Sequence, residues 1–226
     1  MKEFIGAEAA KLAGLLVDAL QKMRDGQMVL GHLEWFNNLT KDERDRFMAG
    51  EKPVSKPTSP EKFGLFVDLG IITVPDGYVH NTRLASFEKE NRKKFYGYND
   101  AITDKNFGKA TTKLVPGRKF RVRVFKQIVD GETTSEERLA FLKTQNAILV
   151  GAQGASLVFE QKREDLPKGF WYCSFDKKKA LWKDAGGDHR VPSVRRRPDE
   201  GWDFDLGGFG GVWGDYGCLL CFCDCD

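Results

Sequence analysis

Histidine is scarce in this sequence, and long apolar runs are absent. The 226 residues include three histidines, His32, His80 and His189, and none belongs to an H-E-x-x-H or similar metal-binding signature. No stretch approaches the length of a transmembrane helix, and no signal-peptide core follows the first residues. These absences argue against a histidine-based metalloenzyme and a membrane-spanning protein. The expected location is the cytoplasm, with export by another route left open.

Cysteine is sparse outside the C-terminus. Four of the five cysteines lie in the last nine residues and Cys173 stands alone, unlike the spread pattern of a secreted disulfide scaffold. Cys218 and Cys221 have the C-x-x-C spacing of zinc ligands. In a strand, however, Cys221, Cys223 and Cys225 share one face while Cys218 faces the other. We therefore expect small buried side chains, and predict neither a metal nor a cofactor.

The charge balance excludes a basic field over the whole chain. The 36 basic and 33 acidic side chains give a net charge of +3. Hydrophobic residues make up 41% of the chain, enough for a sizeable core. Arg121 and Arg123 alternate with Phe120, Val122 and Val124, and such a basic face is typical of a solvated sheet. Nucleic acid is therefore not an expected partner.

Residues 1–55 are predicted to be an N-terminal helical segment. Apolar residues recur at helical spacing over residues 5–24. Thr40 has the capping-box spacing of a second helix, which ends before Gly50. Both helices are expected to serve packing rather than partner binding.

Residues 56–115 are predicted to be a connecting region. A proline-rich loop leads into a strand over residues 63–74, and Pro75-Asp76-Gly77 indicates a turn. Residues 78–106 are polar and show no clear period, so we expect irregular structure there.

Residues 116–226 are predicted to form a mixed α+β domain. Alternation indicates a strand over residues 113–129, and capping-box spacing starts a helix at residues 133–137. The glycine-rich residues 151–155 lack the pattern of a phosphate loop or a dinucleotide fingerprint, and we interpret them as a tight turn. A second helix or strand follows, then a buried strand over residues 170–175 and several short strands.

Large and small side chains are divided unusually in the segment from Val194 to Asp226. Over residues 202–206 the alternation is that of a half-buried strand whose other face carries aspartates. Further on, the positions between the large residues are mostly glycine, which packs nothing and costs chain entropy. The segment indicates a fixed apolar frame with variable exposed positions. The frame residues are Trp202, Phe204, Leu206, Phe209 and Trp213.

Charged residues gather in the same segment. Its aspartates lack the spacing of an EF-hand loop, so we expect an exposed acidic face rather than a calcium site. Arg190 and the run of arginines at residues 195–197 form a basic cluster. This cluster suits either a phosphate or acidic partner or a solvated loop.

Four stretches of the C-terminal half together carry a resemblance to a known protein family. They are TTSEERLAFLKTQNAILVGAQGASLVFEQKREDLPKG from Thr133 onward, WYCSFD, HRVPSV and the ending WGDYGCLLCFCD. This half resembles the variable proteins of diversity-generating retroelements. The resemblance implies a C-type-lectin-like fold of the formylglycine-generating-enzyme-like subtype, with N-terminal helices before it. It also implies a terminal coding segment that a reverse transcriptase rewrites at template adenines.

The genetic code tests this resemblance within the sequence. An AAC codon randomised at its adenines gives NNC codons, which never encode Trp or Glu. Trp202, Trp213 and Glu200 are therefore expected to be constant. The implied ligand-binding surface is a set of positions in residues 195–217 outside the apolar frame, each of which an NNC codon reaches. They are Arg195, Arg196, Arg197, Asp199, Asp203, Asp205, Gly207, Gly208, Gly210, Gly211, Val212, Gly214, Asp215, Tyr216 and Gly217.

The resemblance implies a non-enzymatic protein that binds an unidentified protein or cell-surface molecule, so no catalytic residue is predicted. Tyr216 and the arginines at residues 195–197 are its expected anchors. Two alternatives stay open. One is an enzyme on the formylglycine-generating-enzyme-like scaffold that uses reactive cysteines. The other is a zinc or nucleic-acid module built on the C-terminal cysteines and the basic strand.

Overall fold

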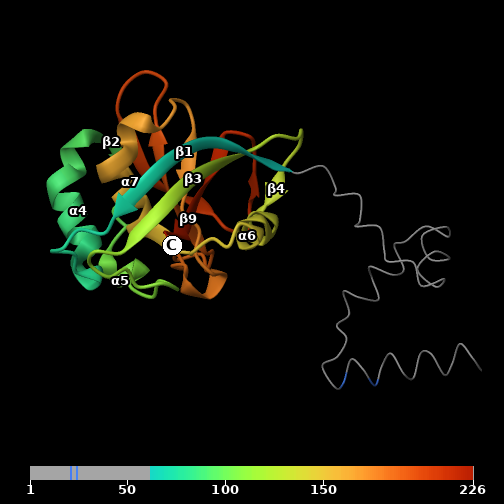
Figure 1. Ribbon diagram of the computed structural model, residues 1–226, viewed down its shortest axis with the longest axis horizontal. Coiled ribbons are helices and arrows are strands. Elements are labelled where there is room, and N and C mark those ends of the chain that lie inside the picture. Colours follow the sequence, from blue (N-terminus) through green and yellow to red (C-terminus); the bar gives the residue numbers. More distant parts are fainter. Residues whose placement is uncertain (1–20, 22–23, 25–61, 226) are drawn as a thin grey trace, which may run out of the picture. The chain divides into compact units, whose positions relative to one another are not determined.

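The computed structural model describes Gln21, Arg24 and residues 62–225. The chain divides into two compact units, Met1–Ser59 and Pro60–Asp226. Gln21 and Arg24 are helical and exposed, and the remaining residues of the two N-terminal helices expected from the sequence lie outside the described residues. The second unit is a mixed α+β fold (Figure 1).

A seven-stranded sheet is the centre of the second unit. Its strand order is β1-β3-β9-β5-β6-β7-β2, and β4 pairs with β8 in a separate two-stranded sheet. The pairs β5–β9 and β2–β7 are parallel, and the other neighbours are antiparallel. The strands are β1 Phe63–Thr73, β2 Phe95–Tyr98, β3 Lys119–Gln127, β4 Thr133–Thr134, β5 Trp171–Cys173, β6 Arg190–Arg196, β7 Trp202–Gly208, β8 Val212–Trp213 and β9 Gly217–Asp224.

Helices join these strands. The α-helices within residues 62–225 are α4 Arg83–Asn91, α5 Asp104–Phe107, α6 Ser135–Thr144 and α7 Gly151–Lys162. Short 3-10 helices lie at η1 His80–Thr82, η2 Arg92–Lys94, η3 Arg163–Asp165 and η4 Lys178–Ala180. None of the helices in this part of the chain combines the length and apolarity that a bilayer span requires.

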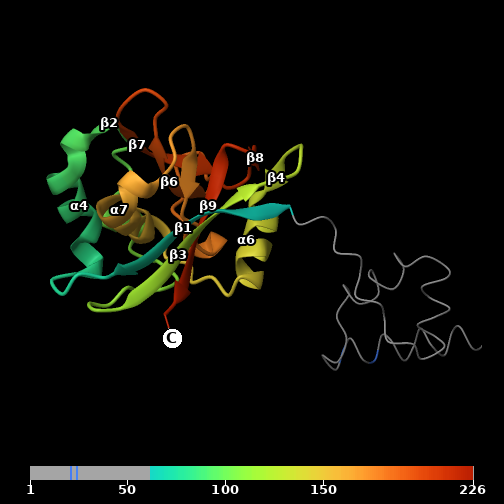
Figure 2. The ribbon, with the colours of Figure 1, turned by 45° about the horizontal axis from the view of Figure 1, so that its top comes forward.

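The two faces of the large sheet pack against different helices, because successive side chains of a strand point to opposite faces. Tyr172 and Phe204 belong to the core that also contains residues of α4 and α7. Cys173 and Phe209 belong to a second core, which contains Leu142 of α6. Figure 2 shows α4 and α7 on one side of the sheet and α6 on the other.

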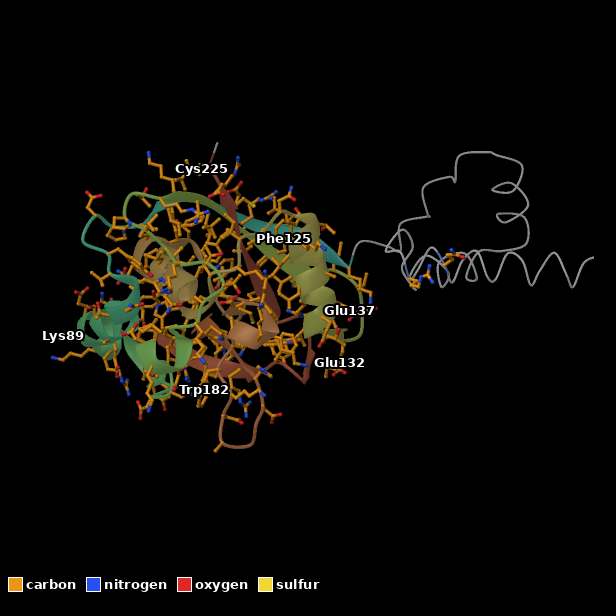
Figure 3. The ribbon with its side chains drawn as sticks, turned by 90° about the horizontal axis from the view of Figure 1, so that it is seen from below. Lys89, Phe125, Glu132, Glu137, Trp182 and Cys225 are labelled. Carbon is orange, nitrogen blue, oxygen red and sulfur yellow. The ribbon has the colours of Figure 1, made fainter. Side chains whose placement is uncertain are left out.

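The layer formed by α6 covers only part of its face of the sheet. Phe125 of β3 packs against Phe141 of α6, with ring centroids 4.9 Å apart, and Figure 3 labels Phe125 beside this helix. Farther along the sheet, the strand register places Trp171, Arg195 and Asp203 next to one another on the same face. Two pockets lie at the end of the sheet around these three residues, and no helix among the described residues lines either of them. The candidate site lies at this end of the sheet.

Several sequence-based predictions are confirmed. The strand over residues 63–74 is β1, and the following turn closes with a bond of 3.0 Å from the Tyr78 amide to the Pro75 carbonyl. The strand over residues 113–129 contains β3. Helix α6 begins with the expected capping box between Thr134 and Glu137. The fold class is mixed α+β, as expected.

The prediction of irregular structure over residues 78–106 is wrong. This stretch contains α4, β2 and α5. The Asp104 carboxylate accepts hydrogen bonds from the amides of Leu84 and Ala85, at 2.9 and 3.0 Å, and so caps α4 from twenty residues away. Strand β2 pairs with β7, and β1 with β3, so the expected division at residue 115 runs through one folded unit.

The prediction of a tight turn at residues 151–155 is also wrong, because these residues form the first turns of α7. A Cβ atom on Gly154 would lie 2.9 Å from Cζ of Phe222 and 3.1 Å from Oγ of Ser174. Glycine is therefore needed here for close packing of α7 against the sheet, not for a turn.

Candidate functional site

A pocket lies where the α6 layer leaves the sheet open. Its cavity volume is about 260 Å³. Seven of its eleven lining residues belong to the surface implied by the codon pattern: Asp205, Gly207, Gly208, Gly211, Val212, Tyr216 and Gly217. The other four are Trp171, Ser193, Leu206 and Trp213. The structure thus brings residues of β7, β8 and the following loop to one concavity.

A second pocket adjoins the first. Its volume is about 370 Å³, and Trp171 and Asp205 line both pockets. It adds Arg197 and Asp203 from the predicted surface and aromatic and polar residues around β2. We call the two pockets together the groove. The second pocket is lined by Tyr96, Gly97, Tyr98, Asn99, Trp171, Arg197, Asp203, Phe204 and Asp205.

The expected apolar frame supports the groove. Phe204 and Phe209 are 0% and 2% exposed, and Trp202 is 8% exposed. Leu206 and Trp213 are half-buried, and both line the first pocket. The indole Nε1 of Trp213 donates a hydrogen bond of 2.8 Å to Oγ of Ser135, the first residue of α6. This bond ties β8 to the covering helix.

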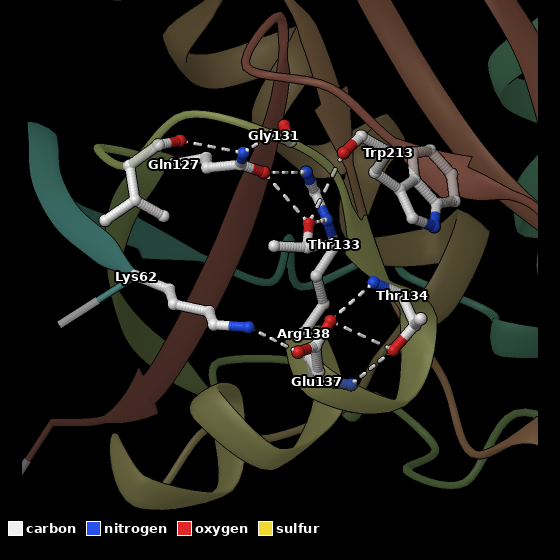
Figure 4. Close-up of polar contacts among 9 residues, drawn as sticks. Lys62, Gln127, Gly131, Thr133, Thr134, Glu137, Arg138 and Trp213 are labelled. Carbon is white, nitrogen blue, oxygen red and sulfur yellow. Dashed lines mark hydrogen bonds and ion pairs between the residues drawn. The ribbon is translucent and has the colours of Figure 1, made fainter. Parts of the chain in front are cut away.

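A buried arginine fixes the loop that closes the first pocket. Arg138 of α6 is 0% exposed. Its guanidinium donates to the carbonyls of Gly217 and Gly214. It also donates to Oγ1 of Thr133 and to the side-chain oxygen of Gln127, as Figure 4 shows. Within the described residues no carboxylate pairs with it, and burial lowers its pKa. The charge is therefore satisfied by neutral oxygen acceptors that also position residues 214–217.

Asp203 does not belong to an exposed acidic face, contrary to expectation. It is 8% exposed, because β2 covers this edge of β7. Its Oδ1 accepts a bond of 3.1 Å from the Gly97 amide, and Nη1 of Arg197 lies 3.6 Å away. Asp205, two residues on, is exposed as expected.

The three consecutive arginines have different environments. Arg195 lies 5.3 Å from the ring centroid of Trp171. Arg196 donates to the carbonyls of Glu164 and Leu166, at 2.8 and 2.7 Å, and so braces the segment before β5. Arg196 is thus a structural contact more than a displayed side chain.

Arg197 lies 4.2 Å from the ring centroid of Tyr96, and it pairs with Asp199 and Asp203. Its hydrogen bond lowers the pKa of Asp199. Arg197 therefore links two of the predicted surface aspartates to the second pocket.

The predicted glycines differ in the space around them. A Cβ on Gly210 would meet nothing within 4 Å, and one on Gly211 would meet only ordinary van der Waals contact. On Gly207 it would lie 2.5 Å from Cη2 of Trp213. Gly217 is buried, and its Cβ would lie 3.2 Å from Nη1 of Arg138.

Gly208 and Gly214 complete the set. A Cβ on Gly208 would lie 3.6 Å from Nη1 of Arg190, whereas one on Gly214 would lie 2.9 Å from Cε1 of Tyr216. Tyr216 is 56% exposed and can move aside. Val212 is 58% exposed and Asp215 is also exposed, so these side chains are displayed as expected.

The C-terminal cysteines lie on two faces of β9, as the strand alternation predicts. Cys218 belongs to the core beside α7, and Cys221 belongs to the core beside α6. Burial raises the pKa of the Cys173, Cys218 and Cys221 thiols to about 12. Within the described residues no group of three or more His, Cys, Asp or Glu side chains is arranged to hold a metal ion.

The basic face of β3 and the described histidines do not form a charged patch with the groove. Arg121 pairs with Asp68 at 2.6 Å, and Arg123 lies 3.5 Å from Sγ of Cys223. His80 is buried and its pKa is lowered by burial. The two pockets are lined by none of these three residues, Arg121, Arg123 and His80.

Sequence reasoning missed the groove residues that lie far from the C-terminus. Trp171 was expected in a buried strand, yet it lines both pockets. Tyr96 and Asn99 fell in the stretch expected to be irregular, and Arg138 lies on a helix for which no role in the site was predicted. The available signal was the tryptophan in the apolar run of residues 170–175, since tryptophan is enriched where proteins bind.

Comparisons with protein-family models, curated proteins and solved structures gave no match to this chain.

Proposed function

We propose that residues 62–225 form a ligand-display domain, and that the chain is a non-enzymatic binding protein diversified at its C-terminal surface by a retroelement. The observation that carries the proposal is the overlap between codon pattern and pocket. Seven of the eleven residues that line the first pocket belong to the predicted variable surface, and a randomised AAC codon reaches each of the seven. Residues of β7, β8 and the following loop would vary together around one concavity.

The proposed division between constant and variable positions agrees with the packing. Trp202, Phe204 and Phe209 are buried, and replacing such residues with alanine costs about 3–5 kcal/mol. Replacing an exposed residue such as Val212 usually changes stability by less than about 0.5 kcal/mol. Diversification of the exposed positions would therefore change the ligand while it preserves the fold.

The proposal includes a C-type-lectin-like scaffold of the formylglycine-generating-enzyme-like subtype. It rests on the sequence motifs, together with a mixed sheet that has helices on both faces. A protein or cell-surface molecule is the proposed partner. The scaffold by itself implies neither sugar nor calcium binding, because a fold does not determine its site.

An enzyme that uses reactive cysteines is the weaker alternative. A nucleophilic cysteine requires an accessible thiolate, whereas burial holds Cys173, Cys218 and Cys221 in the thiol form at neutral pH. Cys223 is partly exposed, but it lies outside the groove. These positions favour a structural role for the thiols.

Sequencing the 3′ end of the gene and its flanks across many cells of one population tests the proposal. We expect substitutions confined to the predicted variable positions in residues 195–217, with an adenine-bearing near-copy nearby. The five frame residues should be constant: Trp202, Phe204, Leu206, Phe209 and Trp213. A uniform sequence without such a copy would refute diversification.

A further inference from the structure

The first pocket has the chemistry of a receptor for a cationic side chain. Asp205 is the carboxylate in its lining, and the lining contains no Lys or Arg. The Asn99 amide and the Leu206 backbone N–H both donate to Oδ1 of Asp205, each at 2.8 Å. Within residues 62–225, Oδ2 has no hydrogen-bond partner and Asp205 no ion pair, so an unneutralised charge lines the cavity.

Neighbouring arginines do not neutralise this carboxylate. Arg190 reaches the rim near Gly208, but Asp184 already pairs with it through two nitrogens. Arg197 pairs with Asp199 and Asp203 in the adjoining pocket. Arg195 is stacked on Trp171 and is outside the lining of both pockets.

Aromatic rings complete the pocket. Trp171 and Trp213 each already have an arginine of this chain within 5.3 Å of the ring centroid, Arg195 and Arg138 respectively. Tyr216, which is 56% exposed, has no such cation among the described residues. An aromatic face attracts a cation by about 0.5–1 kcal/mol at an exposed site, and the tryptophans give an apolar wall for a methylene stem.

The size of the pocket restricts the occupant. Its volume of about 260 Å³ is below the roughly 300–1,000 Å³ typical of sites for drug-sized ligands. It suits one long side chain inserted from a larger partner. We infer that this variant recognises a protein that inserts an exposed arginine or lysine between Asp205 and Tyr216. The inference rests on the proposed display function. It specifies which kind of partner the chain binds with its present sequence at the variable positions.

The test is an NMR titration of the full chain with N-acetyl-L-arginine N-methylamide. The citrulline analogue has nearly the same shape without the charge, and the N-acetyl-L-glutamate analogue reverses it. We expect saturable shifts of the Trp171 and Tyr216 signals with the arginine probe, and much weaker effects with the other two. Asp205→Asn is expected to weaken binding of the arginine probe about fivefold or more, since a charge-assisted hydrogen bond is lost.

Two further variants separate charge recognition from general damage. Tyr216→Ala should also weaken binding of the arginine probe. Because Tyr216 is exposed, this substitution should not disrupt the fold. Asp76→Asn removes an exposed carboxylate in the turn after β1 and should leave binding unchanged. Equal binding of the arginine and citrulline probes, or unchanged binding by Asp205→Asn, would overturn the inference. Preference for the glutamate probe would do so as well.

The outcome is distinguishable from that of the proposed function. If population sequencing shows diversified positions but the arginine probe does not bind selectively, display stands and the assigned ligand chemistry fails. If the gene is uniform but the probe binds through Asp205, the cation pocket stands and diversification fails.

Discussion

The guanidinium of Arg138 donates a hydrogen bond to the carbonyl of Gly217, which lies 79 residues later in the chain. The same side chain donates to Gly214 at 3.0 Å, so one residue of α6 holds both ends of the loop that closes the first pocket. Figure 4 shows two further acceptors of this guanidinium, the side-chain oxygens of Gln127 and Thr133. The pocket is thus positioned by a residue outside the C-terminal segment.

Arg138→Met should destabilise the protein by several kcal/mol. The substitution keeps much of the apolar stem but removes every donor, and each buried acceptor left unsatisfied costs about 1–3 kcal/mol. Chemical denaturation measures the loss. Arg121→Met is the matched control, because Arg121 is exposed and solvent screens its ion pair with Asp68, so this substitution should cost much less. Equal effects of the two substitutions would contradict the anchoring role.

The glycines of the groove should differ in their tolerance of side chains. Gly210→Ser places its side chain in open space, so we expect a stability change within about 0.5 kcal/mol. Gly207→Val drives its Cβ against the ring of Trp213, and Gly217→Val against Arg138, so both should cost about 1–3 kcal/mol. Thermal unfolding of the three variants checks the order. A Gly217→Val variant as stable as Gly210→Ser would show that the loop relaxes freely.

Local patterns were sufficient for much of the fold. The alternation of β3 and the capping box of α6 depend on residues within a few positions, and both predictions are confirmed. Helix α4 and strand β2 could not be found this way. The cap of α4 comes from Asp104, and β2 is stabilised by pairing with β7 more than a hundred residues later. Such contacts leave no short-range signal in the sequence.

The candidate site was predictable only in its C-terminal part. The spacing of large residues identified Trp202, Phe204 and Phe209 as frame residues, and all three are buried. Alternation alone placed Asp203 on an exposed face, and it failed because a neighbouring strand covers that position. Trp171 lines the groove because strand pairing places it opposite Arg195, and a single sequence does not specify which strands pair or in which register.

The capping box of α6 should give stability that depends on pH. The Glu137 carboxylate accepts hydrogen bonds from Lys62 and from the Thr134 amide, which lowers its pKa. A lowered folded-state pKa contributes stability above the unfolded pKa, and this contribution is lost as pH falls through the folded pKa. Glu137→Gln should therefore cost less than about 1 kcal/mol at pH 7 and almost nothing at pH 2.

Urea denaturation of the wild type and Glu137→Gln at the two pH values measures this difference. Glu136→Gln is the control, since Glu136 lies in the same first turn but takes no part in the capping box. A cost of Glu137→Gln that persists unchanged at pH 2 would show that the ionised carboxylate is not the source.

The cysteines should divide into two classes when the folded protein is treated with iodoacetamide at pH 8. Cys173, Cys218 and Cys221 are buried, with thiol pKa values raised to about 12, so we expect no reaction before unfolding. Cys223 and Cys225 are partly exposed and should react. Mass spectrometry of proteolytic fragments identifies the alkylated residues, and all five cysteines should react in urea.

Arg123 gives this experiment a matched variant. Its guanidinium donates a hydrogen bond of 3.5 Å to Sγ of Cys223, so its removal takes a positive charge away from this sulfur. Arg123→Gln should slow the alkylation of Cys223 and leave that of Cys225 nearly unchanged. Rapid alkylation of Cys173 or Cys218 in the folded protein would instead mean that a core thiol is accessible and reactive. That result would favour the enzyme alternative over a display protein, because a nucleophilic cysteine requires an accessible thiolate.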